Sequence, residues 1–461
     1  MAAQPSPHPR STAPATPEVP LPVPDTSWNR RVWRMAGPII LSSISVPILG
    51  AVDTAVVGQL PGAEQIAAVG AGTTVFNVMF QTLLFLRMGT SGLTAQAFGA
   101  GDGTEMRAAL GRPIGLALAI GFALVALQAP IAWLAFTAIG ASEPVTELAR
   151  SYFAIRIWVA PAMLCNLALV GWFIGMQNAR AVLGLQVLIN GVNVGLDLAF
   201  ALGLGWGVAG VAWASLTAQY IGLGLGLLIA RNRLRAAGGE WRLDLLRRAA
   251  PLKRMLAING DIFLRTLCLA GCMATITAIG ARSGDLVLAT NTVMLSMTFV
   301  ASYGLDGFAH AVSALAGSAA GAGDRAQFRL AVRYCGGWAV GVALVMSAVY
   351  LFAGPAIIDV MTEDPTIRVL CREYLPWVIA GPFYSVWCFL LDGIFVGATR
   401  ARDMRNMAFL SALAFVASTI VFVPWLGNHG LWLSYVIFML TRAVTLGSRY
   451  PALERAVGAP A

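Results

Sequence analysis

Carboxylic acids stand inside long apolar stretches in the N-terminal half of the sequence. Asp53 is one of them, and Asp197 follows Asn190 and Asn193 at spacings that place the latter three on one helical face. A charged side chain in mid-membrane costs about 2.5–3.5 kcal/mol, so such residues usually face a cavity or a partner. Two interpretations stay open: a polar patch that holds helices together, and a cavity in which a carboxyl group binds and releases a proton.

Two further carboxylates in the C-terminal half each have a basic residue four positions later. Asp261 precedes Arg265 and Asp306 precedes His310, so each pair can neutralise itself within one helix. Structural ion pairs and a role in a substrate cavity are both open. Arg87 and Arg156 are additional bases inside apolar stretches, and the sequence does not name their partners.

No catalytic or metal-binding constellation accompanies these charges. Gly99-Ala100-Gly101-Asp102 recurs at 321–324 and matches a GxGD pattern of intramembrane proteases, but both copies precede charged residues at the end of an apolar stretch. A glycine turn followed by a helix-capping Asp is the favoured interpretation. HExxH, GxSxG and P-loop patterns are absent, and the six cysteines lie in or beside apolar stretches. We therefore expect no enzyme, no metal, no cofactor and no nucleotide motor, but transport driven by an ion gradient.

The composition indicates a membrane protein. Of 461 residues, 58% are hydrophobic and only 11% are charged, about half the charge of a soluble domain. The mean hydropathy is +0.73. The net charge of +9 comes from arginines in short breaks between apolar stretches, without a clustered basic face. This pattern argues against a nucleic-acid partner and is typical of membrane topology.

Twelve apolar stretches are long enough to cross a bilayer as helices, which needs about 20 residues. They cover residues 35–58, 66–97, 110–137, 148–176, 182–203, 207–230, 254–281, 286–320, 328–353, 367–397, 405–425 and 429–449. The sequence thus predicts an all-α polytopic membrane protein with about 12 transmembrane helices. The basic residues concentrate in alternate loops, so both termini are expected in the cytoplasm.

An internal repeat divides these helices into two halves. At one constant offset of 222 residues, three separate places match. Gly58, Gly62 and Ala67 match Gly280, Gly284 and Ala289; residues 99–102 match 321–324; and Gly171, Phe173, Gly175, Ala179 and Arg180 match Gly393, Phe395, Gly397, Ala401 and Arg402. Six spans per repeat predict two parallel six-helix bundles related by an axis along the membrane normal, with the pathway between them.

The expected organisation has five segments. They are a disordered Pro-rich cytoplasmic tail (1–29), an N-terminal bundle (30–231), a cytoplasmic linker (232–252), a C-terminal bundle (253–450) and a cytoplasmic tail (451–461).

Several long motifs resemble the multidrug and toxic compound extrusion (MATE) family, most of all its DNA-damage-inducible F (DinF-like) branch. They are GPIILSSISVPILGAVDTAVVGQL, LLFLRMGTSGLTAQAFGAGD, DIFLRTLCLAG, SYGLDGFAHAVSALAG and DGIFVGATRARDMRN. The resemblance runs from about residue 30 to about 450. It implies two six-helix bundles around a central cavity that exports organic, often cationic compounds against an inward flow of protons or sodium.

The resemblance also assigns roles to residues. In proton-coupled relatives a network in the N-terminal bundle carries the coupling, and its members match Pro38, Asp53, Tyr152, Asn193 and Asp197. Ser215 stands where the family has threonine, which keeps the hydroxyl. Relatives of the branch often have a glutamate where this chain has Ser313, which favours the N-terminal bundle as the coupling site over a sodium site in the C-terminal half.

The sequence therefore predicts a monomeric antiporter of a bacterial cytoplasmic (inner) membrane that exports small organic substrates in exchange for protons. Asp53, Asp197, Asn193, Tyr152, Pro38, Ser215 and Asn190 are the coupling candidates, and Asp261, Arg265, Asp306, His310 and Arg87 are the cavity candidates. Sodium coupling, a flippase for lipid-linked oligosaccharides, a membrane sensor or scaffold, and a membrane enzyme are the alternatives.

Overall fold

The computed structural model describes residues 28–59 and 62–458 of the chain, except for the side chains of 46–49, 51, 243 and 247. All elements in this part are helical. The prediction of an all-α membrane protein is confirmed. The Pro-rich segment 1–27 lies outside the described residues, so its predicted disorder stays a prediction.

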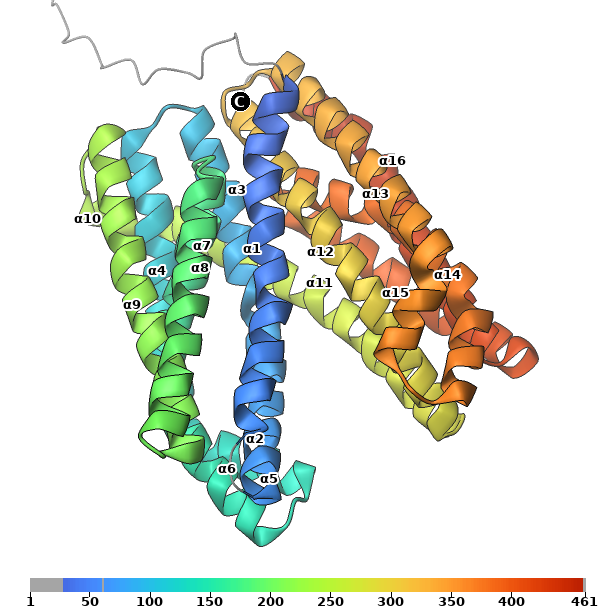
Figure 1. Ribbon diagram of the computed structural model, residues 1–461. Coiled ribbons are helices and arrows are strands. Elements are labelled where there is room, and N and C mark those ends of the chain that lie inside the picture. The colour runs from blue at the N-terminus through green and yellow to red at the C-terminus, as the bar shows by residue number, and fades with distance from the viewer. Residues whose placement is uncertain (1–27, 60–61, 459–461) are drawn as a thin grey trace, which may run out of the picture.

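The helices form two groups (Figure 1). The N-terminal bundle contains α1 (Trp28–Val57), α2 (Ala63–Gln81), η1 (Thr82–Leu84), α3 (Phe85–Gly99), α4 (Gly103–Ala126), α5 (Gln128–Ile139), α6 (Glu143–Arg156), α7 (Val159–Gly175), α8 (Ala179–Asp197), the π-helical turn η2 (Leu198–Gly203) and α9 (Gly207–Ala236). The short α10 (Leu243–Arg247) connects it to the C-terminal bundle. That bundle contains α11 (Ala249–Arg282), α12 (Asp285–Gly321), α13 (Arg325–Met361), α14 (Pro365–Gly397), α15 (Ala401–Leu426) and α16 (Asn428–Ala456).

These helices supply twelve spans. Ten helices or continuous helix pairs are long and apolar enough to cross a membrane, and the α6–α7 pair, bent by 51°, makes an eleventh. The 30-residue α1 runs beside them as the twelfth. Several helices exceed the roughly 20 residues that a membrane requires, so their ends extend into the headgroup layer or tilt.

Several helix ends lie outside the predicted limits. Helix α9 continues to Ala236 and α11 already begins at Ala249, so the connection between the bundles is shorter than the predicted 232–252. Helix α16 continues to Ala456, beyond the expected bundle end at 450. The reason is that an amphipathic helix end remains hydrogen-bonded in the headgroup layer, whereas hydropathy reports only the apolar part of each helix.

The backbone repeats the 222-residue offset that the sequence shows. Gln177 and Thr399 are the two non-glycine residues in the described part of the chain with left-handed φ, at 55° and 56°. Gly101 and Gly323 share a φ of 68°, a conformation that glycine adopts without strain. Asp102 and Asp324 cap the next helices through hydrogen bonds of 2.9 Å from backbone N–H groups. The interpretation of both GAGD copies as capped glycine turns is confirmed.

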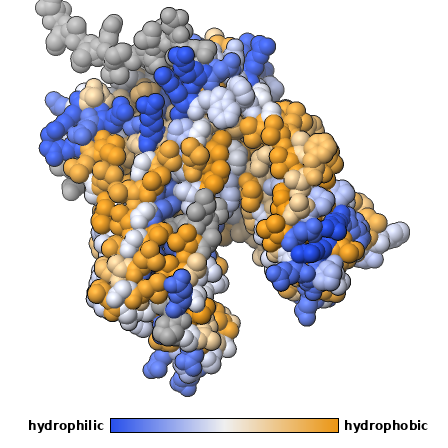
Figure 2. Space-filling view, viewed as in Figure 1, coloured by the Kyte–Doolittle hydropathy of each residue, from blue (hydrophilic) through white to orange (hydrophobic). Residues whose placement is uncertain are grey.

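The two bundles form a V. Figure 1 shows them meeting at the end that carries the C-terminus and diverging toward the end with α5, α6 and the α13–α14 turn. Figure 2 shows the hollow between the two arms open at that wide end, with hydrophilic residues gathered at the tips of the molecule and hydrophobic residues between them. A central cavity between two halves is therefore present, and it is open on one side only.

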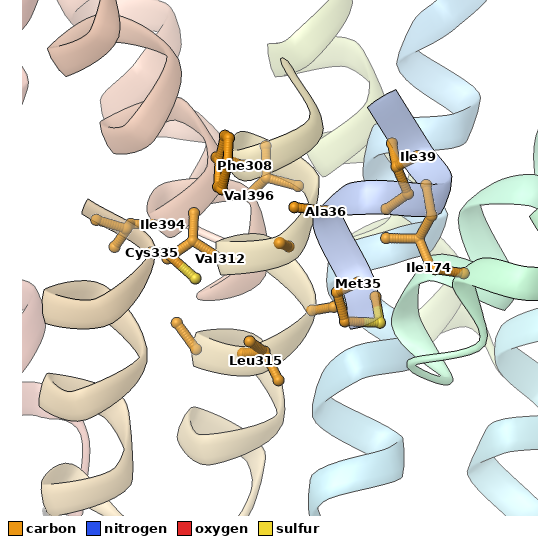
Figure 3. Close-up of a cluster of buried hydrophobic side chains, with 14 of the residues drawn as sticks. Met35, Ala36, Ile39, Ile174, Phe308, Val312, Leu315, Cys335, Ile394 and Val396 are labelled. Atoms are coloured by element: carbon orange, nitrogen blue, oxygen red, sulfur yellow. The ribbon is translucent and has the colours of Figure 1, made fainter. Parts of the chain in front are cut away.

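The narrow end of the V is sealed by apolar packing. Buried side chains from both bundles form one cluster there (Figure 3). Met35 and Ile39 of α1 and Ile174 of α7 lie on one side, and Phe308 and Val312 of α12 lie on the other. Burying each large apolar side chain contributes about 1.5–3 kcal/mol, so this seam stabilises the closed end of the V.

Candidate functional site

The two acidic residues of the N-terminal bundle face each other. Asp53 near the end of α1 and Asp197 at the end of α8 lie within hydrogen-bonding range of one another, with Arg156 nearby. Asp197 is only 1% exposed. The Nδ2 of Asn193 donates to Asp197 at 3.1 Å and approaches the Ser215 hydroxyl of α9 at 3.5 Å. Four of the predicted coupling residues thus come together.

The oxygens of this acid pair are incompletely satisfied. Within the described residues, Oδ1 of Asp53 and Oδ1 of Asp197 are buried and have no hydrogen-bond donor. A buried polar atom without a partner costs about 1–3 kcal/mol. A proton placed between the two carboxyl groups supplies the missing donor and removes one of two adjacent like charges.

Tyr152 and Arg156 of α6 border the acid pair. Tyr152 is fully buried and its hydroxyl lies 3.4 Å from that of Thr73 in α2. The Arg156 guanidinium lies 5.2 Å from the Tyr152 ring centroid and 3.5 Å from the same threonine. The partners that the sequence could not name for Arg156 are thus Thr73, the aromatic ring and the acid pair.

Two other predicted coupling residues stand apart from the acids. Asn190 donates to the Ser45 hydroxyl of α1 at 3.0 Å and accepts from Gln186 at 2.8 Å. It therefore joins α8 to α1 without touching Asp197. Pro38 is fifteen positions before Asp53 in a continuous helix, a distance of about 22 Å. The expectation that Pro38 belongs to the same contact network is wrong, although it removes one backbone donor from α1.

A second polar group lies between the bundles. The Arg87 guanidinium of α3 is 3.9 Å from the Asp306 carboxylate of α12, and His310 Nε2 is 3.9 Å from the same carboxylate. Arg87 and Asp306 are 25% and 35% exposed, so both reach the space between the two halves. The Arg87–Asp306 pair crosses from one bundle to the other, which makes it part of the central cavity.

The predicted pairing of Asp261 with Arg265 is wrong. Asp261 forms an ion pair of 2.6 Å with Arg405 of α15, and Arg265 forms one with Asp392 of α14. Long basic side chains reach neighbouring helices in a packed bundle, so four-residue spacing alone does not choose the partner. Asp261 lines a hollow at the narrow end of the C-terminal bundle and not the central cleft.

Asp392 and Arg442 were missed at the sequence level. Arg442 of α16 also pairs with Asp392, so one carboxylate serves two guanidinium groups. All three side chains are at most 11% exposed. The available signal was the same as for the other candidates, namely charged residues inside the apolar stretches 367–397 and 429–449.

A polar contact joins the bundles at their closed end. Gln96 of α3 donates to the Thr399 hydroxyl at 3.1 Å, and Arg254 of α11 donates to Gln96 Oε1 at 3.1 Å and to Thr399 Oγ1 at 3.0 Å. We call Gln96, Thr399 and Arg254 the inner latch. Within the described residues, no group of three or more His, Cys, Asp or Glu side chains could hold a metal ion.

Comparison with known proteins bears on both the fold and the polar groups. The MatE family model matches residues 38–199 and 262–421, most of both bundles. The chain belongs to the MATE family. It is 43% identical to the DNA damage-inducible protein F of Escherichia coli K12 over 92% of each chain. It is 29% identical to a probable multidrug resistance protein NorM of Deinococcus radiodurans, over 92% of this chain and 95% of that one.

A solved structure shares the fold. An outward-facing multidrug resistance MATE transporter superimposes with a TM-score of 0.82 at 21% identity, covering 93% of this chain and 97% of that one. The chain is therefore a multi-pass membrane transporter of the DinF-like branch that handles small molecules, and not an enzyme.

Proposed function

We propose that this MATE transporter exports organic compounds in exchange for protons, and that the Asp53–Asp197 pair is the coupling site. The supporting observation is the facing position of the two carboxyl groups in α1 and α8 with one oxygen each lacking a donor. One shared proton stabilises this arrangement, and loss of that proton places two like charges side by side. Proton binding and release therefore change the force between α1 and α8.

This force acts on a helix that belongs to both halves. The first part of α1 packs on the C-terminal bundle, where Trp33 contacts Phe308 and Trp338 at centroid distances of 5.6 and 5.2 Å. Its last turns carry Asp53 toward α8. A change between α1 and α8 is thus transmitted to the seam between the bundles, which is the element that alternating access must open.

The proton gradient supplies enough free energy for export. One pH unit gives about 1.4 kcal/mol per proton, and 100 mV adds about 2.3 kcal/mol per charge. Together they support a several-hundredfold gradient of a neutral substrate for each proton exchanged. The chain would lie in a bacterial inner membrane with both termini in the cytoplasm, so that the V opens outward and protons reach Asp53 from outside.

A second candidate is a flippase for lipid-linked oligosaccharides. Such a carrier needs a cationic cavity for its pyrophosphate, and the half-exposed Arg87 between the bundles favours it. The acid pair in the N-terminal bundle would have no role in that reaction, and we therefore place proton-coupled export first.

Proteoliposomes with separately imposed gradients test the proposal. The purified chain is reconstituted and the movement of a fluorescent organic cation is recorded under a proton gradient, a sodium gradient, or neither. We expect transport with the proton gradient and background transport with sodium alone. Equal rates under a sodium gradient would assign the coupling to sodium, and transport of a lipid-linked sugar without any gradient would support the flippase.

A further inference from the structure

A cavity lined with arginines lies at the closed end of the C-terminal bundle, away from the central cleft. Its volume is about 550 Å³, within the range of small-molecule sites. The beginnings of α11 and α15 and the end of α16 form its walls, and its arginines are Arg254, Arg400, Arg402 and Arg449. Asp261 and Asp403 are the opposing acids, and Asp261 is already paired with Arg405. We call this hollow the arginine cavity.

Most of these arginines lack a partner. Within the described residues, the side chains of Arg400, Arg402 and Arg449 form no hydrogen bond or ion pair, and all three are exposed. Other arginines at the same end of the molecule are satisfied. Arg112 pairs with Glu105 at 2.6 Å, and Arg325 pairs with Glu454 at 3.1 Å. Unpaired like charges around one cavity repel each other unless an anion binds between them.

Membrane topology does not account for the cluster. Both bundles end at the same side of the membrane, so the positive-inside pattern applies to both. The positions 222 residues before the four arginines carry Val32, Asn178, Arg180 and Leu227. The N-terminal bundle therefore has one arginine where the C-terminal bundle has four, although the backbone is repeated.

The surroundings of the cavity indicate a lipid. Toward the membrane from the arginines, large apolar side chains are exposed on each of the three helices: Leu256 on α11, Phe409 and Leu410 on α15, and Val444 on α16. Exposed apolar side chains below a basic pocket offer contacts for acyl chains, and arginine forms bidentate hydrogen bonds with phosphate oxygens.

We propose that the arginine cavity binds the phosphodiester headgroup of an anionic membrane lipid, with the acyl chains along α11, α15 and α16. The site is separate from the acid pair and does not depend on the direction or coupling of transport. Because Arg254 lines the cavity and also forms part of the inner latch, a bound headgroup contacts the closed seam between the bundles directly.

Lipid titrations of the full-length chain in detergent test the proposal, with native mass spectrometry as the readout. The added lipids are phosphatidylglycerol and phosphatidylcholine. The test variant carries Arg402→Gln and Arg449→Gln. The control variant carries Arg180→Gln and Arg231→Gln, which remove the same charge from exposed positions of the N-terminal bundle. The thermal midpoint of each variant is measured to confirm that it folds.

We expect phosphatidylglycerol to bind the parent more tightly than phosphatidylcholine. A basic residue near the membrane contributes about a fivefold factor in affinity for anionic lipid, so the test variant should lose about thirtyfold. The control variant should lose less than about twofold. Equal losses in both variants, or no preference for phosphatidylglycerol, would overturn the proposal.

The second arm distinguishes a lipid from a soluble phosphate. Glycerol 3-phosphate and inorganic phosphate are added as competitors of bound phosphatidylglycerol. Because acyl chains contribute to lipid binding, we expect neither to displace it at equal concentration. Displacement by either compound at the concentration of the lipid would assign the site to a soluble anion and overturn the lipid proposal.

Discussion

Charged residues in the two bundles are balanced in opposite ways. In the C-terminal bundle one carboxylate, Asp392, lies between two guanidinium groups. In the N-terminal bundle two carboxyl groups, Asp53 and Asp197, lie together with one guanidinium nearby. The first arrangement keeps its charge, because removing the carboxylate leaves two buried cations. The second can change its charge by one proton without losing every contact. Structural and functional roles are thereby separated between the halves.

Asp392 supports a prediction about stability. Replacing it by Asn leaves Arg265 and Arg442 buried without a counter-charge, and breaking a buried ion pair costs about 3–5 kcal/mol. Asp306→Asn is the matched control, since Asp306 is 35% exposed and its partners lie 3.9 Å away. We expect less than about 1 kcal/mol there. Thermal midpoints of the purified proteins measure both effects, and equal midpoints for the two variants would contradict the assignment.

Asp53 supports a prediction about function. Asp53→Asn keeps the shape of the side chain but cannot release a proton, so proton-driven export should fall to the level of protein-free liposomes. The acid pair then carries one charge less, so the thermal midpoint should stay within a few degrees of the parent. Glu64→Gln, at an exposed position in the same bundle, is the control and should transport normally. Full activity of the Asp53 variant would rule out this residue as the coupling acid.

The sequence allowed the N-terminal site to be predicted better than the C-terminal one. Asn193 and Asp197 lie on one face of α8, and helical spacing reports such local proximity. The partners of Arg265 come from α14 and α16, more than a hundred residues away along the chain. Long-range pairing depends on how the helices pack, and spacing along one helix carries no information about it.

At the scale of elements, glycines set how closely the bundles approach. A Cβ atom at Gly99 of α3 would meet the backbone carbonyl of Ser318 in α12, and one at Gly321 would meet that of Gln96. Gln96 and Ser318 are themselves 222 residues apart, so the two copies of the repeat pack against each other across the pseudo-symmetry axis. Helix backbones can approach this closely only through small residues.

Adding one methyl group should therefore loosen the closed end. In Gly99→Ala the new Cβ overlaps a backbone carbonyl that cannot rotate away, so α3 and α12 must separate. Gly337→Ala on α13 is the control, because nothing lies within 4 Å of its Cβ position. Spin labels at positions 231 and 326, on a background without the six cysteines, report the distance between the bundles at this end. We expect a longer or broader distance distribution only in Gly99→Ala.

The repeat also explains why the fold was predictable from the sequence. Turns such as Gln177–Asn178 and Thr399–Arg400 recur with the same backbone conformation, because each half is built from the same succession of helices and breaks. Hydropathy located the helices, and the constant offset divided them. The open V was not predictable, since one sequence must serve both the outward-open and the inward-open arrangement and selects neither by its pattern.

At the scale of the molecule, the two arms are joined only near one end. The apolar seam, the inner latch and the close glycine contacts all lie at the narrow end of the V, whereas Arg87–Asp306 is a loose ion pair facing the cleft. Rotation about this end closes the wide end without repacking either arm internally. The pseudo-symmetric turns at the wide end, around Ser142 and Glu363, should then approach each other.

Proton binding should shift this equilibrium. With spin labels at positions 142 and 363 in nanodiscs, we expect the distance distribution to change between high and low pH, because the protonated acid pair relaxes the force between α1 and α8. In Asp53→Asn the distribution should no longer respond to pH and should match that of the parent at low pH, since Asn replaces the protonated acid. A variant that still responds like the parent would show that another group drives the motion. Asp306 and His310 would then be the next groups to substitute, since they face the same cleft from α12.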